Sequence, residues 1–164
     1  EAAAWCVLSQ RTRVPVAARL RRDLIVAHGN DGVFPAPDAL IRAIDAEELD
    51  LPGRKPEYLR AVAKAALTGL LNGPRLRTMP EESARRDLLT VTGIGPFATD
   101  LILIRGANAQ DILPRAERRL YAEISYQYGP ESLLEEVAER WRPFRSWAAV
   151  HLRALREQRT REMG

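Results

Sequence analysis

The turn Gly93-Ile94-Gly95 holds the residues whose chemistry is easiest to interpret from type and spacing. The hydrophobic pattern predicts an amphipathic helix before this turn and a second helix directly after it. Glycine lets the backbone turn tightly and come close to a ligand. The second helix presents free N–H groups and the positive end of its dipole, which together bind an anion. We therefore expect a DNA phosphate here; the alternative is a tight helix–helix corner without a ligand.

Other common kinds of reactive site are not indicated by the sequence. It contains no Ser–His–Asp set, no spacing typical of metal ligands and no nucleotide-binding phosphate loop. The single cysteine, Cys6, excludes an internal disulfide framework and any site that needs four cysteines. A lone cysteine also favours a reducing compartment.

The charge balance permits nucleic-acid binding without requiring it. The 164 residues are 46% hydrophobic and 29% charged, with 25 basic and 22 acidic residues and a net charge of +3. Of the basic residues 23 are arginines, whose planar forks suit phosphates and base edges. A basic binding face and a merely arginine-rich surface both fit this balance. No apolar run approaches the ~20 residues that a membrane helix needs.

Apolar residues recur at helical spacing along the whole chain, and no segment alternates with period two. The sequence therefore predicts an all-α protein of nine or ten helices. Thr78 and Glu81 are spaced as a capping box that opens a helix ending at Leu89. The other predicted helices are at 2–9, 15–27, a short stretch after Pro37, 56–72, a stretch after Gly95, 117–127, 131–141 and from about Pro143 onward. We expect Trp5, Trp141 and Trp147 to lie in the core.

Five stretches together resemble a known family: 7–10, 55–63, the glycine turn, 111–114 and 139–149. They resemble the helix–hairpin–helix DNA glycosylases with a Gly/Pro-rich loop and a catalytic aspartate, the HhH-GPD superfamily. Within it the chain is most similar to the bacterial 3-methyladenine DNA glycosylase II type. The resemblance implies two helical lobes flanking a cleft. It also implies one domain over 1–164, with the hairpin motif at about 82–107 and part of the first helix missing upstream.

The resemblance implies a reaction in which a damaged base is flipped out of the duplex and its bond to deoxyribose is broken. The family places a catalytic aspartate six residues after the position of Asp111, where this chain has Glu117. Glutamate keeps the charge but holds it one methylene further from the backbone. The alternative is a solvated Glu117, ion-paired on an arginine-rich helix face, without a catalytic role. Asp111 itself is the fallback carboxylate, although its family position favours a structural role.

Three further positions are implied to line the substrate pocket: Phe97, Leu101 and Arg153. Phe97 stands where family members with lyase activity carry a Schiff-base lysine, so we expect a glycosylase without lyase activity. Leu101 and Arg153 stand where the relative has aromatic residues. The pocket should therefore be less aromatic and more polar than that of the relative, with an altered range of substrates.

The resemblance also implies the DNA contacts. Arg11 stands where the relative inserts a wedge into the gap left by the flipped base; the alternative is an ordinary exposed arginine. A structural Na⁺ or K⁺ would bind the backbone carbonyls of Leu89, Val91 and Ile94, and no other cofactor is expected. The expected DNA-binding residues are Gln10, Arg11, Arg13, Thr92, Gly93, Ile94, Gly95, Phe97 and Ala98.

The sequence thus predicts a DNA glycosylase that removes alkylated bases of the 3-methyladenine type in base excision repair. It would act as a monomer on damaged double-stranded DNA, in the cytoplasm with the nucleoid and away from membranes. The alternative is a DNA- or lesion-binding module of the same fold that cuts weakly or not at all. The glutamate at position 117 is the feature that favours this alternative.

Overall fold

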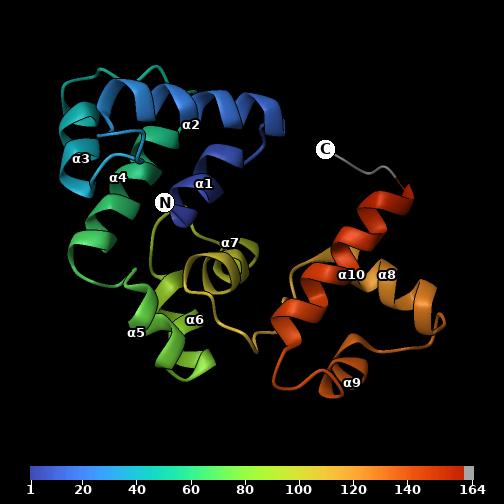
Figure 1. The fold of residues 1–164 in the computed structure, drawn as a ribbon. Helices are drawn as coiled ribbons and strands as arrows, with labels where there is room; N and C mark the ends of the chain where they lie inside the picture. The colour runs from blue at the N-terminus through green and yellow to red at the C-terminus, as the bar shows by residue number, and fades with distance from the viewer. Residues whose placement is uncertain (161–164) are drawn as a thin grey trace.

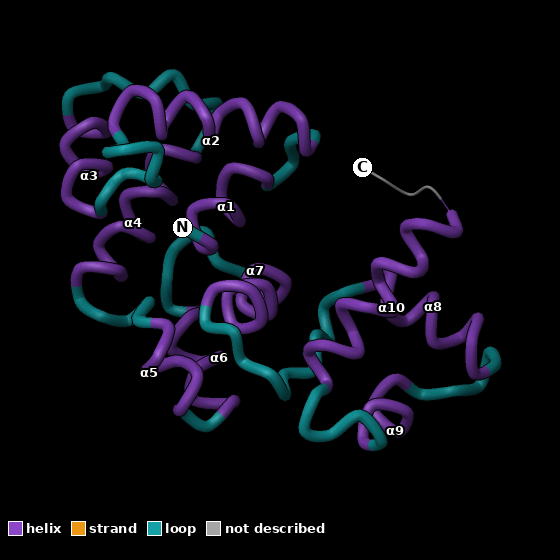
Figure 2. Tube along the Cα trace, in the orientation of Figure 1, coloured by secondary structure: helices purple, strands orange, loops and turns teal. Residues whose placement is uncertain are grey.

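The computed structural model describes residues 1–160, and their regular structure is helical (Figure 1, Figure 2). The one β-type pairing among them is an isolated bridge between Asn30 and Val33. The all-α prediction is confirmed. None of these helices is both long and apolar enough to cross a bilayer. In chain order they are α1 Ala2–Ser9, α2 Val14–His28, α3 Pro37–Asp45, α4 Lys55–Leu67, α5 Gly73–Thr78, α6 Glu81–Leu89, α7 Pro96–Leu101, the π-helical turn η1 Ile102–Gly106, α8 Arg118–Tyr128, α9 Leu134–Glu139 and α10 Arg145–Thr160.

The helices form two lobes, each around its own apolar core. Helices α1 to η1 make the first lobe, whose fully buried residues include Leu8, Leu59 and Leu103. Helices α8 to α10 make the second, around Leu120 and Ile124. Figure 1 shows the lobes side by side, joined by the segment that follows η1. The expected two-lobed arrangement is therefore present.

Asp111 and the start of α10 fasten the lobes together. The carboxylate of Asp111 accepts hydrogen bonds from Arg145 Nε at 2.8 Å and Arg142 Nη1 at 2.9 Å. Burial raises the pKa of Asp111, but these arginine hydrogen bonds outweigh it and hold the pKa below its ordinary value. Ser146 adds a hydroxyl that donates to the carbonyl of Ala109 at 2.6 Å. Asp111 thus lies in a structural network at the junction.

The predicted helix over 56–72 is wrong in its last five residues. Helix α4 ends at Leu67, and Gly69 follows with φ +78°. The N–H of Leu70 then donates to the carbonyl of Ala65 at 3.0 Å, and that of Gly69 to Ala66 at 3.1 Å. This is a Schellman ending, which needs a residue that tolerates a positive φ. The chain then turns into the short helix α5, which the hydrophobic pattern did not indicate.

Two smaller expectations also fail. Thr78 ends α5 and its hydroxyl donates to the carbonyls of Pro74 and Arg75, so it does not cap α6. Trp147 is 57% exposed, because it lies three residues before the pocket-lining Val150 on α10. The core face of α10 carries Ala149 and Leu152 instead. Trp141 packs against the second core as expected, whereas Trp5 is half-buried.

Candidate active site at the junction of the lobes

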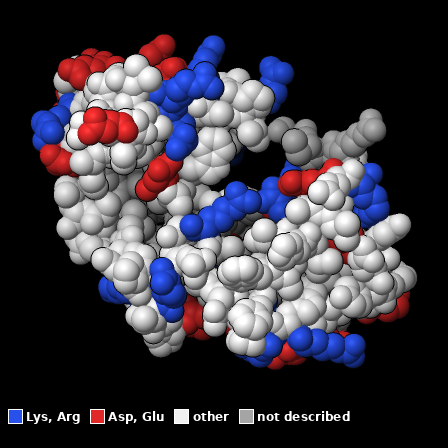
Figure 3. Space-filling model, in the orientation of Figure 1, with Lys and Arg blue, Asp and Glu red and all other residues white. Residues whose placement is uncertain are grey.

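A pocket of about 620 Å³, including its open mouth, lies between the two lobes. Helix α7 and η1 form one side, α10 forms the other, and Pro114 and Glu117 close it at the start of α8. Figure 3 shows a hollow between the lobes on this face of the molecule, with basic side chains gathered along it. Most of the wall is apolar. Its apolar residues are Phe97, Leu101, Ile104, Pro114, Ala149, Val150 and Ala154.

The structure brings all four residues expected at the reaction centre into this pocket. Phe97, Leu101, Glu117 and Arg153 line it together, although up to 56 positions separate them in the chain. Phe97 is its one aromatic residue and is 46% exposed, so its ring is free to contact a ligand. The pocket is therefore polar on one side and has little aromatic surface.

Glu117 is the N-cap residue of α8, and this role fixes its carboxylate. One oxygen, Oε1, accepts a hydrogen bond from the backbone N–H of Arg119 at 3.1 Å. The other, Oε2, lies 3.4 Å from Nε of Arg153. The side chain is only 12% exposed, so the carboxylate is not on a solvated face. The carboxylate thus lies at the positive end of a helix dipole and lines the pocket.

Arg153 connects Glu117 to a second acidic residue of the pocket. Its Nη2 lies 2.9 Å from Glu157, and Arg119 Nη1 approaches the same carboxylate at 3.4 Å. Positive and negative groups therefore alternate along one wall. The buried Nε of Arg153 has no hydrogen-bond partner in the described structure, so its approach to Glu117 is an ion pair only.

The hairpin turn is built around Gly93 and the ring of Tyr58. Gly93 has φ +90°, and a Cβ placed there would lie 2.5 Å from Cγ of Tyr58. Only glycine meets both conditions without strain. Gly95 has φ −105°, and a Cβ there would meet nothing within 4 Å. Its surface is therefore open to a ligand.

The expected wedge loop is tied directly to this turn. Gln10 Nε2 donates to the carbonyl of Gly93 at 2.6 Å. Lys55, a buried cation, donates to the carbonyls of Val7 at 3.0 Å and Gln10 at 2.8 Å. Desolvation lowers the pKa of Lys55. Among the expected DNA-binding residues, Gln10 thus also donates a hydrogen bond to the protein's own backbone.

Arg11 and Arg13 are exposed next to this anchored residue, and Arg11 has φ +51°. A non-glycine residue with such a backbone costs energy and needs its surroundings to hold it. Thr92 is exposed as well. The side chains of Val91, Ile94 and Ala98 are buried, so these residues reach a ligand only through their backbone.

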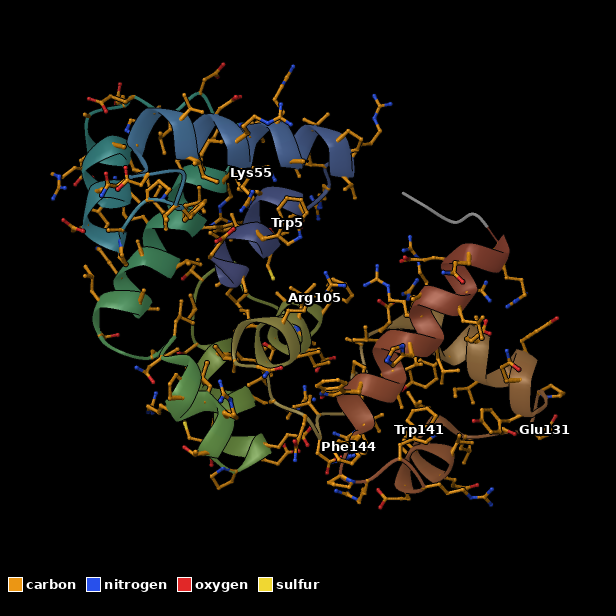
Figure 4. The ribbon with its side chains drawn as sticks, in the orientation of Figure 1. Trp5, Lys55, Arg105, Glu131, Trp141 and Phe144 are labelled. Atoms are coloured by element: carbon orange, nitrogen blue, oxygen red, sulfur yellow. The ribbon has the colours of Figure 1, made fainter. Side chains whose placement is uncertain are left out.

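Sequence reasoning missed three residues around the pocket: Arg85, Asp100 and Arg105. Asp100 lines the pocket, is 3% exposed and forms an ion pair with Arg85. Burial raises the pKa of Asp100, and the hydrogen bond from Arg85 opposes that rise. Arg105 lines the mouth and is exposed; Figure 4 places it on the side of the first lobe that faces α10. The helical phase from Phe97 pointed to Asp100 and Leu101 alike, but nothing in the sequence paired Asp100 with Arg85.

Replacing Arg105 with glutamine should weaken duplex binding similarly for damaged and undamaged DNA. A mouth arginine that contacts a phosphate contributes ~1 to the slope of log affinity against log salt, so the slope should fall by about that amount. Duplex affinity measured at four salt concentrations checks this. Arg42→Gln on α3 removes an equal charge from a residue paired with Asp38. An equal loss of slope in that control would show that only net charge matters.

Known proteins that are similar to this chain are named as DNA glycosylases. A putative DNA-3-methyladenine glycosylase of Bacillus subtilis is 24% identical over 90% of this chain, and DNA-3-methyladenine glycosylase 2 of Escherichia coli is 28% identical over 89%. The chain covers 55% and 54% of those two proteins, so it spans about half their length. A solved 3-methyladenine DNA glycosylase of Schizosaccharomyces pombe, in complex with abasic DNA, superposes with a TM-score of 0.72 at 22% identity. That match covers 93% of this chain and 77% of the other.

The two-lobed helical fold with a helix–hairpin–helix turn is that of the HhH-GPD glycosylases. No family model matches the chain. In sequence and fold the chain is nevertheless similar to DNA glycosylases named for 3-methyladenine. The resemblance predicted from the sequence is confirmed.

Proposed function

We propose that this protein is a DNA glycosylase that hydrolyses the bond between an alkylated base and its deoxyribose. The observation that carries the proposal is Glu117, an anchored and largely buried carboxylate in the pocket between the lobes. The names of the relatives support DNA repair as the setting. We propose a monomer acting on damaged double-stranded DNA in the nucleoid of the cytoplasm.

In this mechanism the pocket residues have different roles. A base flipped from the duplex would stack on Phe97, opposite Arg153. As the bond from C1′ to the base nitrogen breaks, its electron pair leaves with the base and positive charge develops on the sugar. The Glu117 carboxylate stabilises that charge, which is a strong effect in a site that excludes water. Water then adds to C1′, and its proton passes to Glu117.

The hairpin and the loop at Arg11 hold the DNA in this mechanism. The open surface at Gly95 admits a phosphate, and Arg11 fills the gap that the flipped base leaves. Because Gln10 joins this loop to Gly93, phosphate binding and gap filling are mechanically linked. No described backbone N–H outside the helices donates to the carbonyls of Leu89 or Ile94, and Val91 accepts one hydrogen bond. These carbonyl oxygens suit a monovalent cation, which would supply positive charge toward the phosphate.

We propose that the enzyme lacks lyase activity. A lyase needs an amine in the pocket to form a Schiff base with the sugar. The described lining residues include no lysine, and Phe97 stands at the position of the family's lysine.

A binding module without catalysis is the second candidate. The ion pair between Glu117 and Arg153 favours it, because a neutralised carboxylate stabilises a developing cation less well. Both candidates predict salt-dependent duplex binding.

Base release from methylated duplex DNA under single-turnover conditions tests the proposal. The wild-type protein should release methylated purines with first-order kinetics and leave an intact strand with an abasic site. Strand cleavage would contradict the absence of lyase activity. Duplex binding with no release above the uncatalysed rate would establish the binding module instead.

A further inference from the structure

We propose that Arg85 and Asp100 are a positioning pair that fixes where the Glu117 carboxylate lies in the pocket. The inference rests on the proposed glycosylase and adds two residues that act through Glu117. They lie on α6 and α7 of the first lobe, whereas Glu117 begins α8 of the second. The pair therefore controls the one carboxylate of the proposed mechanism from across the lobe junction.

The contacts of the pair fall on the segment directly before Glu117. Arg85 Nη2 donates to the carbonyl of Leu113 at 3.0 Å. Asp100 Oδ2 accepts the backbone N–H of Ala116 at 3.2 Å. Arg85 Nη1 and Asp100 Oδ1 close the arrangement with their ion pair. The first and last residues of 113–116 are thus held by one rigid unit, and the next residue is Glu117.

The guanidinium of Arg85 also has a third hydrogen-bond partner, Glu81. Its Nε donates to Glu81 at 2.9 Å, within the same helix. Arg85 therefore uses its three nitrogens on three different acceptors, which a planar guanidinium can do and an ammonium cannot do with the same geometry. A largely buried arginine–carboxylate pair is costly to break, because removing one partner leaves the other charge unpaired.

Asp100 lines the pocket, but its surroundings favour a positioning role over a catalytic one. One of its oxygens pairs with Arg85 and the other accepts the N–H of Ala116. Asp100 is only 3% exposed, whereas the side chain of Glu117 is 12% exposed and therefore more accessible to a substrate. We infer that Asp100 affects the reaction through the position of Glu117.

Asp100→Asn is the sharpest test, because it keeps the shape and removes one acceptor. An asparagine has one carbonyl oxygen, and both Arg85 and Ala116 need an acceptor there. One of the two contacts is lost, and the start of α8 moves relative to the pocket. Misplacement by ~1 Å costs roughly a hundredfold in rate, so a partial shift should slow single-turnover base release about tenfold. Affinity for an abasic duplex should stay within about twofold.

Glu123→Gln is the matched control. Glu123 is also a fully buried carboxylate, paired with Arg159 at 2.5 Å, but its partners are on α8 and α10. It should lower thermal stability without slowing base release. The combination Asp100→Asn with Glu117→Gln should be no slower than Glu117→Gln alone, since both changes act through one group.

Hydrogen exchange provides a readout that does not depend on activity. The Ala116 amide should exchange faster in Asp100→Asn than in wild type or Glu123→Gln. If Asp100→Asn does not fold, Arg85→Lys should show the same faster exchange and slower release. Equal exchange in all variants, or additive rate losses with Glu117→Gln, would overturn the positioning role. If wild type releases no base, the proposed function fails, and the exchange result alone still decides whether the pair fixes this segment.

Discussion

Replacing Glu117 with glutamine should slow base release by about 10²–10³-fold and leave duplex affinity unchanged within about twofold. Loss of one preorganised group that stabilises transition-state charge costs about this much in other enzymes. Glutamine keeps the length and can still accept the N–H of Arg119, so the start of α8 should be preserved. What it removes is the negative charge opposite the developing positive sugar. Single-turnover release from methylated duplex, beside binding to an abasic duplex, measures both quantities.

Glu157→Gln is the control for this change. Glu157 lines the same pocket and pairs with the same arginine, Arg153, so the substitution removes an equal charge from the same space. Its effect on release should be much smaller, because no hydrogen bond from a helix N-terminus fixes its carboxylate. Equal losses in the two variants would mean that the net charge of the pocket, rather than Glu117, controls release. Unchanged release in Glu117→Gln would move the chemistry to another group.

Local signals in the sequence predicted the hairpin turn, and the family resemblance implied the residues of the pocket. Glycines at 93 and 95 between two amphipathic patterns indicate a turn whatever packs around it, and the resemblance supplied the spacing to Glu117. The residues Phe97, Leu101, Glu117 and Arg153 then meet in one pocket. The stop after α4 was also present in the sequence, because Gly69 and the Asn72-Gly73-Pro74 run end and restart helices. The hydrophobic periodicity alone does not show this helix stop, because apolar residues continue at helical spacing beyond it.

The remaining features depend on tertiary packing, which one sequence does not report. Asp100 and Arg85 are 15 positions apart on different helices, and nothing in the sequence shows that they pair until α6 and α7 pack against each other. The apolar residues of α10 lie on two faces of the helix, one toward the core and one toward the pocket. Their spacing does not tell which face carries Trp147, so its predicted burial in the core is wrong. The hydrogen bond from Gln10 to the carbonyl of Gly93 joins residues 83 positions apart, and nothing in the sequence indicates it.

Gly93→Ala should destabilise the protein strongly and, where it remains folded, abolish duplex binding. A non-glycine residue at φ +90° costs ~1–3 kcal/mol, and forcing a methyl against the Tyr58 ring costs a further ~1–3 kcal/mol. For a chain of this size that corresponds to a fall in Tm of about 5–20 °C. The displaced turn would also disturb the carbonyl that Gln10 holds, and with it the loop at Arg11. Thermal unfolding and duplex binding well below Tm measure the two effects.

Gly95→Ala tests whether a ligand approaches the turn without straining the backbone. Gly95 lies in the same turn as Gly93, but its φ is −105° and a Cβ there would meet open space. The variant should keep the wild-type Tm within about 2 °C, since φ and packing permit alanine. Its methyl nevertheless projects from the surface that a phosphate would approach, so duplex affinity should fall. Wild-type affinity in Gly95→Ala would show that the turn is only a helix–helix corner. Adding Tyr58→Ala to Gly93→Ala removes the contact but not the positive φ, and should recover part of the lost Tm.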